Sequence, residues 1–284
     1  MEAVSTFGEG TKSMEGNYIE YAQDYGYYWF GPLPENLEIT RGIHYRFLLK
    51  LASFMLCRSP QVVPNRTFIR NSSSAKDFGN TRFSKGNIFR YDDRIDAAQN
   101  YDLIRCMAHE IMAHLLAPKV HGPDQIEEWL YEGIANAFSI CLPFRPPIQF
   151  RDGKYHQATL NMLCQKYYTS PMLHAGFEEL QAQATNNEYA REQLSARAWA
   201  FVVCTDFRAR DLVGGKVGGV QQRPVEDLAV KVMIKSRHEG KPYGLQQWFE
   251  RLEPLMGDES KALFTKMDKG EVFVFRSKHW CQNS

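Results

Sequence analysis

The chain has 284 residues, of which 44% are hydrophobic and 24% are charged, as in ordinary folded globular proteins. Its 34 basic and 33 acidic residues give a formal net charge of +1, which favours neither nucleic acid nor an anionic membrane as a partner. The first residues lack the basic and apolar segments of a signal peptide, and the six cysteines form no CxxC pair. We therefore expect a cytoplasmic protein with reduced thiols and one large or two small domains.

The N-terminal third has a mixed pattern. Residues 1–35 are rich in Gly, Tyr and acidic groups without a clear period, and predict an irregular arm. Its aromatic run Tyr25–Phe30 favours core packing, with capping of a cleft as the alternative. Leu37–Thr40 predicts a short strand, and Ile43–Leu56, with apolar residues at helical spacing, predicts a helix. Between residues 60 and 92, short β-prone runs separated by Ser, Asn and Gly predict two or three strands.

Helices are predicted for most of the remaining chain. Asn100–Leu116 predicts a helix that ends before Pro118, and Ile126–Ile140 predicts a second one that ends before further prolines. The glycine-rich stretch 213–219 indicates a flexible break, and Glu271–Arg276 indicates a final strand. Apolar periodicity predicts six more helices, at 156–168, 174–186, 188–210, 225–238, 244–254 and 258–268.

These elements predict an α+β fold with a small mixed α/β N-terminal lobe and a helical C-terminal lobe. The boundaries that we expect are an N-terminal arm over 1–35, an α/β lobe over 36–118 and a helical lobe over 119–284. The first lobe ends in the helix that carries the residues with the clearest chemistry.

That helix reads CMAHEIMAHLLA over residues 106–117 and holds His109, Glu110 and His114 in an apolar setting. Buried polar groups need partners, and a metal ion bound to both histidines would supply one. The histidines stand at i and i+5, which is about 140° apart on a regular α-helix. A single π-bulge would absorb the extra residue and return both to one face. The alternative is a helix with satisfied buried histidines and a solvated Glu110–His114 pair.

A second segment, QIEEWLYEGIANAF over residues 125–138, carries Glu132 directly before Gly133. A W-L-x-E-G-x-A run that follows a His-Glu helix resembles the signature of the gluzincin metallopeptidases, whose fold is thermolysin-like. The H-E-x-x-x-H spacing is similar to that of the dipeptidyl peptidase III family, which also holds zinc. The resemblance implies one Zn²⁺ per chain, bound by His109, His114 and Glu132, with the fourth position open for water. It implies that Glu110 is the catalytic base.

The later helices extend this resemblance to the glycyl aminopeptidase family within the same clan. The order of AWAFVVCTDFRARDL (198–212), RPVEDLAVKVMIK (223–235) and PYGLQQWFERLEPLMG (242–257) is similar to its C-terminal helical lobe. The resemblance implies a catalytic domain without the family's large N-terminal β-domain and its PDZ domain.

Several residues depart from the clan's pattern. The Y-x-[KR]-G motif, whose tyrosine stabilises the oxyanion, is matched by Ser195-Ala196-Arg197-Ala198, so a serine stands at the tyrosine position. The carboxylate that often follows the glutamate ligand by four residues is Asn136. The segment Phe78–Phe83 lies where a glutamate usually binds a substrate amine, but it holds none. Candidates to replace the missing oxyanion tyrosine are Tyr167, Tyr168 and Tyr189.

The metal-binding set and the base are therefore present, whereas the groups for peptide recognition differ. We predict a zinc-dependent hydrolase of the metallopeptidase or aminopeptidase type, acting on a peptide or a small molecule. Two alternatives stay open: a zinc enzyme of small-molecule metabolism on the same scaffold, and a non-catalytic relative. Arg208 and Arg210 are candidates for binding a substrate carboxylate, or else they pair with Asp206 and Asp211.

Overall fold

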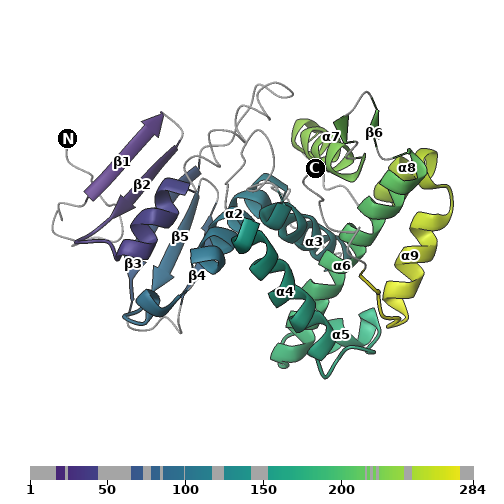
Figure 1. Cartoon of the computed structure of the whole chain (residues 1–284), viewed down its shortest axis with the longest axis horizontal. Coiled ribbons are helices and arrows are strands. Elements are labelled where there is room, and N and C mark those ends of the chain that lie inside the picture. The colour runs from purple at the N-terminus through teal and green to yellow at the C-terminus, as the bar shows by residue number, and fades with distance from the viewer. Residues whose placement is uncertain are drawn as a thin grey trace. The chain divides into compact units, whose positions relative to one another are not determined.

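The protein divides into two compact units, Met1–His114 and Leu115–Ser284 (Figure 1). The first unit is built on a five-stranded sheet and the second on helices, so the predicted α+β class is confirmed. No helix among the described residues is long and apolar enough to cross a membrane. The computed structural model describes residues 17–22, 25–43, 65–72, 78–83, 86–98, 100–116, 125–141, 153–214, 216–217, 220–221, 224–239 and 245–275.

The sheet of the first unit is mixed. Its strand order is β1-β2-β3-β5-β4, with the two inner pairs parallel and the two outer pairs antiparallel. The strands that the sequence predicts between residues 60 and 92 are confirmed as β3, β4 and β5. The strand bounds are β1 Asn17–Ala22, β2 Tyr25–Trp29, β3 Asn65–Asn71, β4 Phe78–Phe83 and β5 Gly86–Tyr91.

The prediction of an irregular arm over residues 1–35 is wrong where β1 and β2 form. Residues 25–29 of this run form β2, in which Tyr27 is fully buried, and Phe30, just after the strand, is exposed. Tyr28 stacks on Phe68 of β3 at 5.0 Å between ring centroids. The prediction that this aromatic run packs in the core therefore holds for Tyr27 and Tyr28. Their rings provide buried apolar surface, whereas the neighbouring glycines have no side chain to bury.

The prediction of a strand at Leu37–Thr40 is also wrong, because residues 35–43 are helical. Pro34 opens this helix, and its carbonyl accepts from the Glu38 amide at 3.0 Å. Leu37 and Thr40, one helical turn apart, are both fully buried, whereas Ile39 is exposed. The four residues 37–40 are too few to distinguish the helical period of 3.6 from the strand period of 2. The rest of the predicted helix Ile43–Leu56 lies outside the described residues.

Two helical elements complete the first unit. The short 3₁₀ helix η1, Ile95–Ala97, follows β5, and the amide of Asn36 donates to the Ile95 carbonyl at 2.6 Å. Helix α2 spans Asn100–Leu116, with the bounds that the sequence predicts. The boundary between the two units falls inside α2, after His114.

The second unit is a helical bundle around α6. Helix α6 contacts each of the six other helices described in this unit, and it is buried at every residue from Ala196 to Thr205. All seven helices were predicted, with ends shifted by a few residues. Their bounds are α3 Gln125–Cys141, α4 Gly153–Thr169, α5 Phe177–Gln183, α6 Glu188–Leu212, α7 Pro224–Glu239, α8 Leu245–Met256 and α9 Glu259–Asp268. A small hairpin pairs β6, Lys216–Val217, which lies in the predicted flexible break 213–219, with β7, Val220–Gln221, which follows it.

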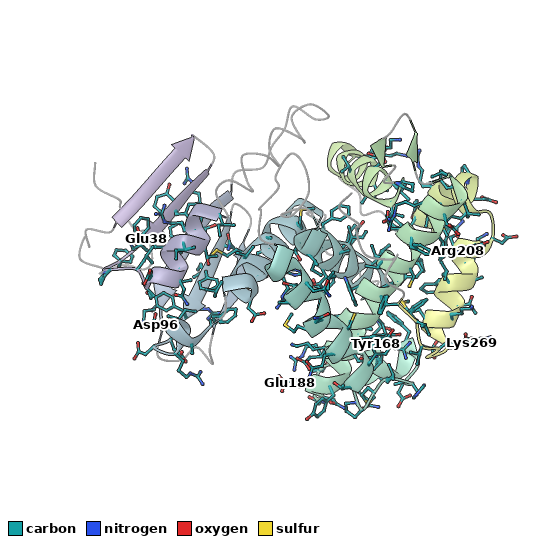
Figure 2. All side chains as sticks on the ribbon, viewed as in Figure 1. Glu38, Asp96, Tyr168, Glu188, Arg208 and Lys269 are labelled. Atoms are coloured by element: carbon teal, nitrogen blue, oxygen red, sulfur yellow. The ribbon has the colours of Figure 1, made fainter. Side chains whose placement is uncertain are left out.

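The final strand predicted at Glu271–Arg276 is not found in its described part, residues 271–275. Phenol hydroxyls of α4 replace a neighbouring strand there. The Tyr167 hydroxyl accepts from the Phe273 amide at 2.9 Å. The Tyr168 hydroxyl donates to the Phe273 carbonyl at 2.9 Å and accepts from the Phe275 amide at 3.0 Å (Figure 2). The two phenols thus bind the Phe273 and Phe275 backbone groups that a neighbouring strand would otherwise bind.

Candidate metal centre

Helix α2 carries the first half of the predicted site. Its buried face includes Met107 and Met112, and between them His109 and Glu110 are half-buried. Nδ1 of His109 and Oε2 of Glu110 are both shielded from solvent. A half-buried imidazole and carboxylate on adjacent residues suit a site that is partly closed to water yet open to a ligand. The side chain of His114 is not among those described.

The backbone of α2 is α-helical at every residue from Asn100 to Leu116, with no π turn. The bulge that we considered for the i, i+5 spacing is therefore not found. On a regular α-helix, positions at i and i+5 stand about 140° apart. Binding of one ion by both histidines would thus require α2 to open locally, which makes the role of His114 a separate question from that of His109.

Helix α3 carries Glu132. Every residue from Trp129 to Ile140 is buried except Glu132, which is half-buried. Trp129 packs against three phenylalanines of α5, α6 and α9, with ring centroids 5.1–5.9 Å apart. A helix this apolar on all sides belongs in a core. Within residues 129–140, Glu132 is therefore the carboxylate placed where a ligand can reach it.

Gly133 has a packing role that the sequence alone did not show. A Cβ at this position would lie 2.6 Å from both the backbone C and the O of Ala198 on α6. Two helices approach this closely only where side chains are minimal. The Glu-Gly dipeptide thus combines a half-buried carboxylate with a point of close contact between α3 and α6.

The two residues that depart from the clan's pattern on these helices contact each other. Asn136 Nδ2 donates a hydrogen bond to Ser195 Oγ at 3.0 Å. Asn136 is buried and Ser195 is half-buried, and the bond links α3 to α6 one turn away from the Gly133–Ala198 contact. The pair is an amide and a hydroxyl, so it carries no charge.

The tyrosines suggested as replacement oxyanion donors have other roles or positions. The hydroxyls of Tyr167 and Tyr168 bind the backbone of Phe273 and Phe275, as described above. Burial raises the pKa of both phenols above its ordinary value. Tyr189, in the first turn of α6, is 59% exposed. Tyr167 and Tyr168 therefore hold the C-terminal segment through hydrogen bonds that join residues more than 100 positions apart in the sequence.

Replacing Tyr167 by Phe is expected to lower the free energy of unfolding by about 1–3 kcal/mol, since the buried Phe273 amide would lose its acceptor. Zinc content should not change. Urea unfolding, with Tyr189→Phe as the exposed control, measures the effect. Unchanged stability together with a loss of catalysis in Tyr167→Phe would instead assign this phenol to the reaction.

The arginines of α6 are engaged within the protein. Arg208 forms a two-pronged ion pair with Glu259 of α9, at 2.9 and 3.0 Å, and contacts Asp211 at 3.1 Å (Figure 2). Arg210 pairs with Asp206 at 2.8 Å, and both are largely buried. The alternative that these arginines pair with acidic residues therefore holds for both. Arg208 pairs with Glu259 in addition to Asp211.

The boundary between the two units separates His109, Glu110 and His114 on α2 from Glu132 on α3. The two helices are therefore described separately. Within the described part of the chain, no three His, Cys, Asp or Glu side chains come together as a metal site. Since the side chain of His114 is not among those described, the predicted set stays a prediction. Its donors, two imidazoles and one carboxylate, are those that catalytic zinc prefers.

Comparison with known proteins gives the fold a context. No family model and no curated sequence matches the chain. Its structure is similar to that of an aminopeptidase N family protein from Idiomarina loihiensis, with a TM-score of 0.68 and 12% identity over 91% of this chain and 47% of that one. It is also similar to an M1 zinc metallopeptidase from Deinococcus radiodurans and a variant of it, with TM-scores of 0.51 and identities of 12% and 11%.

These likenesses confirm a gluzincin-like fold. The two Deinococcus structures are matched over 91% of this chain and 52% of theirs. The chain thus spans about half the length of the proteins it matches. At 11–12% identity the comparison shows the fold alone, and the closer resemblance to glycyl aminopeptidases stays a prediction.

Proposed function

We propose that the chain is a zinc-dependent hydrolase on a metallopeptidase scaffold. The observation that carries the proposal is the placement of two short motifs within that fold. His109-Glu110 lies on α2, which follows a mixed sheet, and Glu132 is the half-buried carboxylate within the stretch 129–140 of α3, whose other residues are buried. The solved structures with a similar fold include a zinc metallopeptidase and an aminopeptidase N family protein.

In this proposal His109, His114 and Glu132 hold the ion, and Glu110 accepts the proton of the attacking water. When bound, zinc supplies a water of lowered pKa and polarises the substrate carbonyl. The half-buried position of Glu110 suits a base, since partial desolvation keeps a carboxylate reactive while a ligand can still reach it. Binding by both histidines requires a local opening of α2 by one residue.

A second candidate is a zinc enzyme that acts on a small molecule other than a peptide. The Asn136–Ser195 hydrogen bond favours it, because this neutral pair lies where the clan has a carboxylate and an oxyanion-binding phenol. A serine hydroxyl is much shorter than a phenol, and loss of one oxyanion donor typically costs about 100- to 1000-fold in rate. The two candidates share the metal and the base and differ in substrate.

We expect near-stoichiometric zinc in wild-type protein and its loss in His109→Ala, His114→Ala and Glu132→Ala. Mass spectrometry of metals on protein purified without added metal measures this. His174→Ala and Glu192→Ala are matched controls, because both side chains are exposed on the second unit and neither belongs to the two motifs. Wild-type protein that takes up no zinc, even when zinc is supplied, would refute the proposal. Zinc retained in His114→Ala alone would remove that histidine from the ligand set.

A further inference from the structure

Ser195 has an unused hydrogen-bond donor beside the proposed metal ligand on α3. Its Oγ accepts from Asn136 Nδ2 at 3.0 Å, and among the described residues its own O–H group donates to no acceptor. Helical hydroxyls usually donate to a carbonyl one turn earlier. Thr169 and Thr265 do so here, at 2.9 Å each. Ser195 does not, so its donor is available to a ligand.

Asn136 fixes the direction of that donor. An amide nitrogen can only donate, so Asn136 Nδ2 occupies an acceptor site of Ser195 Oγ and leaves the hydroxyl hydrogen to point elsewhere. Asn136 is itself buried on a crowded helix, and it therefore holds its partner in a defined place. Ser195 is half-buried, which leaves it within reach of a bound molecule.

The pair lies close to Glu132. Asn136 stands four residues after Glu132 on α3, and side chains at this spacing share one helix face, with Cβ atoms about 5–6 Å apart. Ser195 contacts Asn136 from α6, one turn from Ala198, which in turn packs on Gly133. The proposed ligand and the free hydroxyl therefore both adjoin Asn136 within one unit, and at Gly133 and Ala198 the side chains between the two helices are small.

We infer that Ser195 binds an uncharged oxygen of the substrate, a hydroxyl or carbonyl close to the reacting bond, with Asn136 as its positioning residue. This inference rests on the proposed function and names its substrate class. A charged amine cannot accept the serine hydrogen and could only donate to the second lone pair of Oγ, so the free hydrogen itself favours an oxygen acceptor at this point. The substrate class is then polar and uncharged at the position next to the scissile group.

Small hydroxamates test this, because they chelate zinc and carry variable groups. The probes are two matched pairs: glycolohydroxamate against propionohydroxamate, and 3-hydroxypropionohydroxamate against butyrohydroxamate. Each pair exchanges a hydroxyl for a methyl group. Glycine hydroxamate adds a charged amine. Calorimetric titration of zinc-loaded, full-length protein should show that at least one hydroxyl probe binds about fivefold more tightly than its methyl partner, and that the amine gives no gain.

Two variants probe the residues. In Ser195→Ala the hydroxyl preference should fall to about one. In Asn136→Asp the carboxylate would accept the serine hydrogen and so remove the preference while Ser195 remains. Ser139→Ala is the control, since that α3 hydroxyl donates to the Asn136 carbonyl at 2.9 Å and should leave the preference unchanged.

The outcomes separate the two proposals. Probes that bind with the same hydroxyl preference in Ser195→Ala as in wild type overturn this inference and leave the zinc enzyme standing. A tighter fit for glycine hydroxamate than for glycolohydroxamate also overturns it, in favour of an aminopeptidase. Protein that binds neither zinc nor any hydroxamate overturns the proposed function, and this inference with it.

Discussion

Replacing Glu110 by Gln is expected to leave zinc bound and to lower turnover by about 100- to 10,000-fold. Glutamine has nearly the same shape but cannot accept a proton, so the variant removes the base without creating a cavity. Glu110 is half-buried next to His109, and an isosteric change disturbs this helix least. The measurement is hydrolysis of aminoacyl, peptide and ester reporters by wild type and variant, with zinc determined on the same samples.

Glu188→Gln is the control for this experiment, because Glu188 is exposed at the start of α6 (Figure 2). It should hydrolyse the reporters like wild type. Full activity in Glu110→Gln would show that this carboxylate is not the base. Zinc-loaded wild type that is inert on every peptide but turns over an ester would favour the small-molecule enzyme over the peptidase.

The helices could be predicted because their signals are local. Asn100–Leu116 combines an apolar period of 3.6 with a proline just beyond its end, and both limits agree with the structure. The strands β1 and β2 were missed because glycine and acidic residues surround their tyrosines, and only the pairing of β2 with β3 makes the alternation visible. Residues 271–275 have β-prone side chains, but their backbone bonds to tyrosine hydroxyls and not to a second strand.

The motifs of the candidate site were also readable, since each is a short run of residues. The sequence did not show how the helices pair. The bond between Asn136 and Ser195 joins residues 59 positions apart and depends on the register of α3 against α6. A signal for that register was present in the small residues Gly133 and Ala198, which allow the closest approach. The π-bulge could not be predicted either way from spacing alone.

Arg197, two residues after Ser195, shows how the scaffold supports this region. It is completely buried, and its guanidinium donates to four backbone carbonyls, those of Leu173, Met267, Gly270 and Glu271. Burial lowers the pKa of this guanidinium, and the neighbouring Tyr167 opposes the shift. An arginine nonetheless remains charged in a protein, so a full positive charge is held by carbonyl dipoles. It stabilises the loop before α5 and the end of α9 together.

Arg197→Met is therefore expected to be the most destabilising single change that we predict, at more than about 3 kcal/mol. The variant fills most of the volume but leaves four carbonyls without their charged donor, and hydrogen bonds to charged groups contribute about 1.5–3 kcal/mol each. The free energy of unfolding of a native domain is about 5–15 kcal/mol in total, so part of the variant protein should unfold at physiological temperature. Urea unfolding and the proteolytic sensitivity of residues 271–275 measure the loss.

Arg208→Met is the matched control on the same helix. Its partners Glu259 and Asp211 are partly exposed, and exposed ion pairs contribute at most about 1 kcal/mol. A large difference between the two variants would establish that Arg197 acts through buried carbonyls and not through its charge alone. Equal and small effects would mean that the C-terminal segment is held by the tyrosines alone. In that case, the arginine of the Ser195-Ala196-Arg197 run would need a role beyond stability.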